Sequence, residues 1–370
     1  MDVLTMGVEE EYLLVDRVSR APVNRAPKVI SALEGLMGEQ VQAEFYNAQV
    51  EVCTVPTADR ADLREQLVRL RGTVAPSASE VGCLLVASGV PVIAPQEPLT
   101  VTDNERYRRM ARRFASLVGP SRMVCGCHVH VGALDRKRAL ALSNHIRPWL
   151  PVLQSLTGNS PVECGRDTGF DSWRSVAFSA WPTVGPPPLL DEPRYLEYVD
   201  GMVGSGVLLD RRMLYWYARP SEHVPTLEFR IADVNADVDT VVLLAALVRG
   251  LAGTLLAEAD ADVPPPQPAT ATLRRAHEMA AEHGIDGLGL DPVSGLERPA
   301  ALLVERLLER AAPGLAAAGD LYAVESLWDD LRRQGTGASR QRAALRRTGS
   351  LRGVVDSLVV GTAAAAPLAG

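Results

Sequence analysis

The sequence is short of basic residues and of cysteine. Its 370 residues contain 38 Lys and Arg against 45 Asp and Glu, a formal net charge of −7, which excludes a general affinity for nucleic acid or anionic membranes. The five cysteines are odd in number and lie in apolar settings, which favours free buried thiols in a reducing compartment. No basic, apolar leader opens the chain, and no membrane-length stretch lacks charges or breakers. We therefore expect a cytoplasmic protein with no membrane partner.

The usual phosphate-binding loops are also missing. The sequence contains neither Gly-x-x-x-x-Gly-Lys-Ser/Thr nor a Gly-x-Gly-x-x-Gly that follows a strand. The glycines at 201, 204 and 206 lack that context and are more typical of a helix end. An anionic substrate would therefore have to be held by local cationic side chains or by a bridging metal.

The composition is that of an ordinary globular protein, with 47% hydrophobic and 22% charged residues. Periodicity predicts strands at 3–15, 41–54, 83–89, 123–131, 213–218 and 226–233, with helices between them. From residue 238 onward the sequence is alanine-rich and predicts a series of helices, interrupted by a proline-rich linker at 264–266. The length allows one large domain or two.

The strand at 123–131 carries two histidines two residues apart. Because side chains alternate along a strand, His128 and His130 share one face, while Cys125 and Cys127 point to the other. This geometry argues against a zinc site made from the two thiols and the two imidazoles. A buried strand with two hydrogen-bonded histidines is the simplest alternative for this stretch alone.

Three other predicted strands carry a polar pair on one face. If all four strands lie in one sheet, that face repels itself unless cations fill it, and its reverse packs on helices. Carboxylates with one imidazole suit Mg²⁺ or Mn²⁺, and a metal-bound nucleoside triphosphate is the natural ligand. A solvated face of ion-paired neighbours is the alternative for an isolated strand. The three pairs are Glu9 and Glu11, Gln49 and Glu51, and Glu228 and Arg230.

These motifs, in this order, resemble the carboxylate–amine ligase family labelled glutamate–cysteine ligase type 2. The resemblance covers about the first 255 residues. Its motifs are Gly7-Val8-Glu9-Glu10-Glu11-Tyr12, Glu44 with Gln49-Val50-Glu51, Cys125 to Gly132, Gly165-Arg166-Asp167-Thr168-Gly169 with Ser172 and Arg174, Arg219-Pro220-Ser221, and Thr226 to Arg230.

The resemblance implies an α+β fold related to glutamine synthetase and glutamate–cysteine ligase. A mostly antiparallel, curved sheet would bind ATP and metal on one polar face and carry helices on the other. Residues 1–255 would form this catalytic part, and residues 256–370 a helical C-terminal part packed on the same domain. These C-terminal helices could equally form the interface of a homo-oligomer.

The resemblance also implies the reaction and the residues that perform it. The γ-phosphate of ATP would pass to a substrate carboxylate, and an amine would attack the acyl phosphate to give an amide, ADP and phosphate. The small-molecule substrates would be glutamate and cysteine or another amine, with ATP and Mg²⁺ or Mn²⁺ as cofactors. Arg230, which could neutralise a transferring phosphoryl group, and Glu51 are the expected catalytic residues. The metal-ligand set is Glu9, Glu11, Glu44, Glu51, His128 and Glu228, and the substrate-binding set is His130, Arg166, Arg174 and Arg219.

Two other functions fit the same residues. A metal-dependent hydrolase could use His128, His130 and the carboxylates, with water as nucleophile at an open metal site and no need for ATP. A homologue that binds a nucleotide without ligase activity is the non-enzymatic alternative. The filled set of charged positions favours the ligase.

Overall fold

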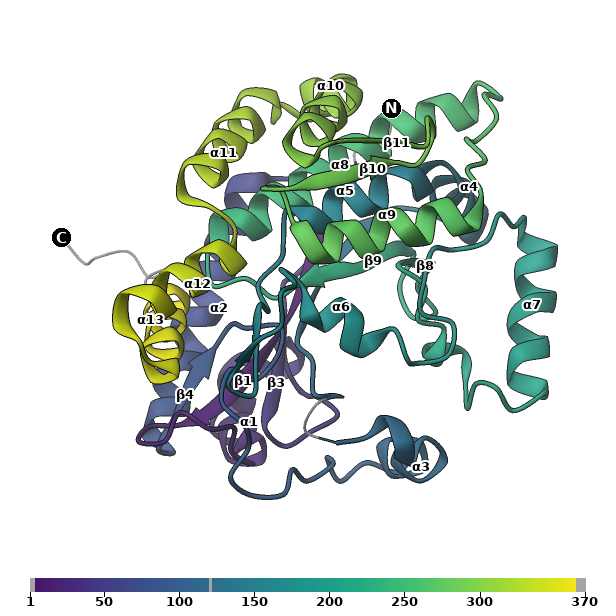
Figure 1. Cartoon of the computed structure of the whole chain (residues 1–370). Helices are drawn as coiled ribbons and strands as arrows, with labels where there is room; N and C mark the ends of the chain where they lie inside the picture. Colours follow the sequence, from purple (N-terminus) through teal and green to yellow (C-terminus); the bar gives the residue numbers. More distant parts are fainter. Residues whose placement is uncertain (1–3, 120–121, 364–370) are drawn as a thin grey trace.

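The structure is a computed structural model that describes residues 4–119 and 122–363. Its centre is a seven-stranded sheet in the order β2-β3-β1-β5-β9-β8, with β4 paired to the far end of β1 (Figure 1). All of its strand pairs are antiparallel, which confirms the predicted α+β class. The strands are β1 (Met6–Asp16), β2 (Val41–Ala43), β3 (Gln49–Cys53), β4 (Cys83–Val86), β5 (Gly126–Gly132), β8 (Ala218–Pro220) and β9 (Thr226–Asp233).

The strand register gathers the polar pairs onto one face. Glu9 on β1 lies opposite His128 on β5, and Glu11 lies opposite Glu51 on β3. His130 in turn lies opposite Glu228 on β9. Directly opposed residues of antiparallel strands project to the same side, so three strand pairings bring these carboxylates and imidazoles together.

Helices pack around the sheet, and those of the C-terminal part come after the long helix α8 in the sequence. The helices are α1 (Ala26–Met37), α2 (Arg60–Glu80), α3 (Glu105–Arg113), α4 (Arg136–Ile146), α5 (Leu150–Ser155), α6 (Trp173–Phe178), α7 (Glu192–Gly204), α8 (Val238–Asp260), α9 (Thr270–His283), α10 (Ala300–Ala318), α11 (Leu321–Gln334), α12 (Gly337–Thr348) and α13 (Leu351–Ala363). Two short hairpins complete the fold, β6 (Val162–Glu163) with β7 (Arg166–Asp167), and β10 (Leu288–Asp291) with β11 (Leu296–Pro299).

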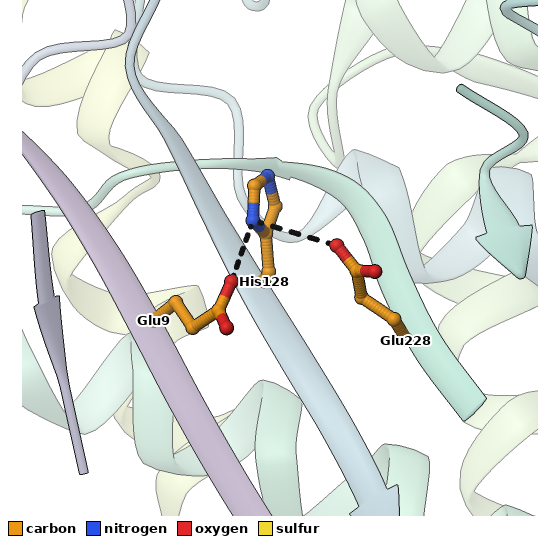
Figure 2. A group of neighbouring side chains, drawn as sticks. All are labelled: Glu9, His128 and Glu228. Carbon is orange, nitrogen blue, oxygen red and sulfur yellow. Dashed lines mark hydrogen bonds and ion pairs between the residues drawn. The ribbon is translucent and has the colours of Figure 1, made fainter. Parts of the chain in front are cut away.

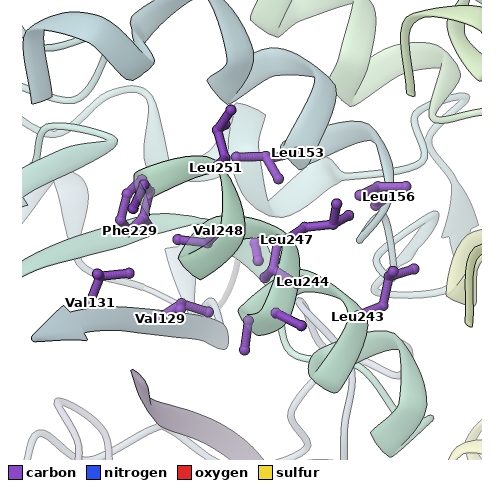
Figure 3. Close-up of a cluster of buried hydrophobic side chains, with 14 of the residues drawn as sticks. Val129, Val131, Leu153, Leu156, Phe229, Leu243, Leu244, Leu247, Val248 and Leu251 are labelled. Atoms are coloured by element: carbon purple, nitrogen blue, oxygen red, sulfur yellow. The ribbon is translucent and has the colours of Figure 1, made fainter. Parts of the chain in front are cut away.

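The non-polar face of the sheet packs on α8. Val129 and Val131 of β5 and Phe229 of β9 meet Leu247 and Val248 of the helix (Figure 3). By length and composition α8 could cross a membrane, but 94% of its apolar window is buried inside the protein. It is therefore the central core helix, and its burial supplies the hydrophobic free energy that fixes the polar face opposite.

Helices of the C-terminal part belong to the same core. Leu303 and Leu307 of α10 and Trp328 of α11 lie in one buried cluster with Val129 of the sheet. We propose on this ground that residues 1–255 and 256–370 form one domain.

Three predicted elements differ from the structure. The strand expected at 41–54 is divided, because a turn at 44–48 separates β2 from β3. The strand expected at 213–218 is wrong: a 3₁₀ turn occupies Arg211–Met213, and β8 begins only at Ala218. The aromatic residues of this stretch pack in a separate apolar cluster around α7. The C-terminal part, predicted as a series of helices, also contains the β10–β11 hairpin. The predicted start of the first strand at Val3 lies outside the described residues.

Candidate active site

A cavity of about 600 Å³ opens over the polar face of the sheet. It is bordered by β1, β3, β5 and β9, by α3, and by the turn that leads into β8. The structure brings ten of the eleven predicted site residues to its wall, Arg166 being the exception. The ten are Glu9, Glu11, Glu44, Glu51, His128, His130, Arg174, Arg219, Glu228 and Arg230.

Arg166 lies elsewhere. It is exposed on β7, and its guanidinium sits 5.9 Å from the ring centroid of Trp173. Among the described residues, none that lines the cavity belongs to β7.

His128 is the centre of the polar face. Its buried ring lies between Glu9 and Glu228, with Nδ1 at 3.2 Å from Glu9 Oε2 and 3.8 Å from Glu228 Oε1 (Figure 2). Its Nε2 lies 3.7 Å from Glu11 Oε1. The imidazole therefore faces carboxylates with both of its nitrogens.

Two groups of metal-ligand atoms share this histidine. Glu9 and Glu228 form one with His128, and Glu11 and Glu51 form the other, with the ligand atoms of each group within 4.8 Å of one another. The backbone N–H of Gly126 donates to Glu11 Oε2 at 2.6 Å and orients that carboxylate. Carboxylate oxygens are hard donors and the single imidazole nitrogen is a borderline one, so this carboxylate-rich set fits Mg²⁺ or Mn²⁺ better than a structural zinc ion.

The acids nearest β3 are electrostatically crowded. Burial, reinforced by the charge of Glu11, raises the pKa of Glu44 to about 8. Burial and the charges of Glu9, Glu44 and Glu11 likewise raise the pKa of Glu51 well above its usual range. Both carboxyl groups therefore hold protons at neutral pH until a cation compensates the negative charge.

The acids nearest β9 have cationic neighbours. Burial acts to raise the pKa of Glu228, but Arg219 and Arg230 outweigh it and bring the pKa well below its usual range. Burial also acts to raise the pKa of Glu9, but hydrogen bonds with His128 and His130 outweigh this effect and lower the pKa. These two acids are therefore ionised at neutral pH.

Arg219 and Arg230 hold Glu228 from two sides. Arg219 Nε donates to Glu228 Oε2 at 2.7 Å, and its Nη1 donates to the carbonyl of Leu214 at 2.7 Å. Arg230 donates to Glu228 Oε1 and lies 5.7 Å from the ring centroid of Tyr215. Arg219 is thus tied to the backbone, whereas the rest of the Arg230 guanidinium borders the cavity.

His130 and Arg174 complete the predicted set. His130 Nδ1 lies 2.8 Å from Thr226 Oγ1, and its Nε2 lies 3.2 Å from Glu9 Oε1. Arg174 enters from α6, and its Nη2 donates to the carbonyl of Arg230 at 3.2 Å. A Cβ at Gly126 would collide with Arg174 Nη2, so any other residue at this position of β5 would displace the Arg174 guanidinium.

One wall of the cavity was not predicted from the sequence. Arg106 and Tyr107 reach it from α3, and the Tyr107 hydroxyl donates to Glu44 Oε2 at 3.4 Å. Tyr215 and Phe178 also line the cavity, with their ring centroids 5.2 Å apart. The arginine-rich helix and the aromatic run were visible in the sequence, but no local pattern indicates that they meet at the same cavity.

Comparison with known proteins finds a matching family and relatives that align over almost the whole chain. The family described as "Glutamate-cysteine ligase family 2 (GCS2)" matches residues 5–360. The chain is 45% identical over 360 residues to "Putative glutamate--cysteine ligase 2-1" of Saccharopolyspora erythraea, covering 97% of this chain and 95% of that protein. It is 42% identical over 364 residues to "Putative glutamate--cysteine ligase 2" of Salinispora tropica, covering 98% and 96%.

Solved structures share the fold at low sequence identity. A glutamate–cysteine ligase of Francisella tularensis, in complex with AMP, matches with a TM-score of 0.73 and 12% identity, covering 100% of this chain and 90% of that one. A bifunctional glutathione synthetase of Pasteurella multocida matches with a TM-score of 0.70 and 17% identity, covering 98% of this chain and 52% of that one. These matches confirm the architecture of the sheet and its helices.

Proposed function

Because this chain belongs to glutamate–cysteine ligase family 2, and is therefore an ATP-dependent ligase that forms amide bonds, we propose that it couples glutamate to an amine through an acyl phosphate. A glutamate carboxylate oxygen attacks the γ-phosphorus of ATP, and ADP leaves. The amine nitrogen then attacks the acyl carbon and loses a proton, and phosphate leaves with one former carboxylate oxygen. The observation that carries the proposal is that two clusters of possible metal ligands share His128 and lie in the same cavity as Arg230.

We propose Glu9, Glu11, Glu44, Glu51, His128 and Glu228 as the residues that hold divalent cations. When bound, Mg²⁺ or Mn²⁺ would offset the negative charge of both the carboxylates and the nucleotide phosphates. The crowding that raises the pKa of Glu44 and Glu51 supports this assignment, since such a face is stable in its ionised form only with a cation. This arrangement can bind a triphosphate without a glycine-rich loop.

Arg230 is proposed to stabilise the transferring phosphoryl group. Its guanidinium is held by Glu228 and by the nearby ring of Tyr215, so its charge is placed before the reaction begins. A planar fork can donate to two phosphoryl oxygens at once, and preorganised charge of this kind lowers the barrier to phosphoryl transfer. Glu51 is the second proposed catalytic residue, as a cation ligand.

The substrate carboxylates are proposed to bind on the arginine side of the cavity, with Arg174, Arg219 and His130 as their partners. Arg174 is the strongest of the three, because no carboxylate lies closer to its guanidinium than Asp233 Oδ1 at 4.0 Å among the described residues. Arg166 lies outside the cavity and has no part in this arrangement. The names of the relatives support glutamate and cysteine as the first pair of substrates to test.

The test is to incubate the purified protein with ATP, Mg²⁺ and a panel of acids and amines, and to measure ADP and phosphate. ADP release that requires both an acid and an amine supports the ligase. ATP binding without turnover for any pair would favour the nucleotide-binding homologue instead. Metal-dependent hydrolysis of an amide without ATP would favour the hydrolase.

A further inference from the structure

Helix α12, in the C-terminal part, lies outside the cavity yet contacts the segment that carries Arg174. Figure 1 shows α12 on the side of the molecule away from α3, which borders the cavity. No described residue of α12 lines the cavity. Even so, the backbone N–H of Ala338 donates to the carbonyl of Gly158 at 2.8 Å, at the start of the segment 158–174.

Two side chains of α12 form hydrogen bonds and ion pairs with this segment. Gln341 Nε2 donates to the backbone carbonyl and to Oδ1 of Asn159, both at 2.8 Å. Arg342 pairs with Asp171, lies 3.1 Å from Asp167 Oδ2 through its Nε, and donates to the carbonyl of Phe170 at 2.9 Å. Arg342 thus holds the segment at three points.

The inner side of the same segment is fixed by Asp233, at the end of β9. This buried carboxylate accepts from the backbone N–H of Asn159 at 2.9 Å and from the Ser160 and Ser172 hydroxyls at 2.6 and 2.7 Å. Ser160 Oγ also accepts from the backbone N–H of Arg174 at 3.0 Å. A continuous set of polar contacts therefore runs from α12 through Asn159 to Arg174.

The segment has little regular structure with which to hold itself. Between Gly158 and Arg174 it contains only the two-residue strands β6 and β7 and the first residues of α6. Gly165 and Gly169 have positive φ angles of 93° and 82°. A chain of this kind takes its position from the partners on either side, which here are α12 and the end of β9.

We propose that α12 is a positioning element for substrate binding, and that Gln341 and Arg342 hold the segment 158–174 so that Arg174 faces the cavity. The inference rests on the proposed function, in which Arg174 binds a substrate carboxylate. When the contacts of Gln341 and Arg342 with the segment are lost, the position of Arg174 that binds the acid is populated less. The apparent affinity for the acid then falls by the same factor. A fall in the competent population to between a third and a tenth raises the KM for the acid about 3- to 10-fold.

The experiment compares Arg342→Gln with Arg332→Gln in the full-length protein. Arg332 is the control for loss of an arginine charge that does not reach the segment 158–174: it makes a single ion pair, 3.3 Å from Glu305, on the neighbouring helix α11. We expect Arg342→Gln to raise the KM for the acid about 3- to 10-fold, with the KM for ATP and the melting temperature close to those of Arg332→Gln. Amide hydrogen exchange in residues 158–174 should be faster only in Arg342→Gln.

A double mutant separates positioning from general damage. In an Arg174→Lys background, Arg342→Gln should add little to the KM for the acid, because both changes act through the same guanidinium. Equal KM values for Arg342→Gln and Arg332→Gln, or parallel increases for acid and ATP, would overturn the inference.

Failure of the proposed function has a different signature. If the wild-type protein consumes ATP with no acid and amine, the ligase proposal fails. Hydrogen exchange is then the measurement that tests whether α12 positions the segment 158–174. Wild-type exchange in residues 158–174 of Arg342→Gln would then refute positioning by α12, and faster exchange would support it.

Discussion

Glu10 and Glu11 are neighbours on β1, but their side chains lie in different surroundings. Substitution by glutamine should therefore affect stability at Glu10 and metal binding at Glu11. Glu11 faces the cavity, whereas Glu10 faces the interior and is fully buried. Arg71, also fully buried, pairs with both oxygens of Glu10, and the Tyr12 hydroxyl donates to Glu10 Oε2 at 2.5 Å. Glu10→Gln therefore removes the countercharge of a buried guanidinium.

The magnitude of the loss follows from this burial. Removing one partner of a buried ion pair leaves an uncompensated charge and costs about 3–5 kcal/mol. Arg71 would keep the backbone carbonyls of Asn235 and Ala236, each at 2.7 Å, and the amide oxygen of the new glutamine as acceptors, but it would have no countercharge. Glu11→Gln removes one of several like charges and keeps an oxygen that can accept from Gly126, so its free energy of unfolding should change by less than about 1 kcal/mol.

Chemical denaturation at pH 7, with and without Mg²⁺, separates the two variants. Glu10→Gln should lower the free energy of unfolding under both conditions. Glu11→Gln should unfold like the wild type without Mg²⁺, but lose the stabilisation that bound Mg²⁺ gives the wild type. A Glu10→Gln protein as stable as the wild type, or a Glu11→Gln protein that still gains full stabilisation from Mg²⁺, would refute the division of β1 into a structural and a metal-binding face.

Three further predictions concern the cavity. Arg230→Lys should lower kcat by at least about tenfold and change the KM for ATP far less, because a point charge cannot replace the bidentate fork; a rise in that KM with kcat unchanged would contradict the role. Because the pKa of Glu44 is raised to about 8, binding of Mg²⁺ at pH 7 should release protons, and its affinity should increase from pH 6 to pH 8. Calorimetry in buffers of different ionisation enthalpy measures this release, and its absence would contradict the assignment of Glu44. Cys127→Ala should leave Mg²⁺ affinity unchanged, since the thiol is buried in the core behind the sheet; loss of metal binding would restore the zinc interpretation.

Much of the polar face could be predicted because strands have a period of two. Once Glu9, Glu11, His128 and His130 were assigned to strands, alternation alone fixed which residues shared a face. The antiparallel register then placed Glu9 opposite His128. Glu44 could not be found in this way, because it lies in a turn. Only the resemblance to the family brought it into the metal-ligand set.

Other features depend on contacts that no local pattern encodes. The aromatic stretch 213–218 has the composition of a strand, yet its rings pack around α7 and leave the chain outside the sheet until Ala218. Arg342 and Asp167 are 175 positions apart in the sequence. Nothing near either residue predicts that α12 supports the segment that carries Arg174.

The most direct test of the proposed ligase follows oxygen atoms. Glutamate labelled with ¹⁸O in both carboxylates, or any other acid that supports ADP release, is incubated with ATP, Mg²⁺ and the active amine, and the phosphate is analysed by mass spectrometry. An acyl-phosphate route predicts one ¹⁸O atom in each phosphate released and one ADP for each amide formed. Phosphate without the label, or ADP formed at the same rate without acid, would contradict the account.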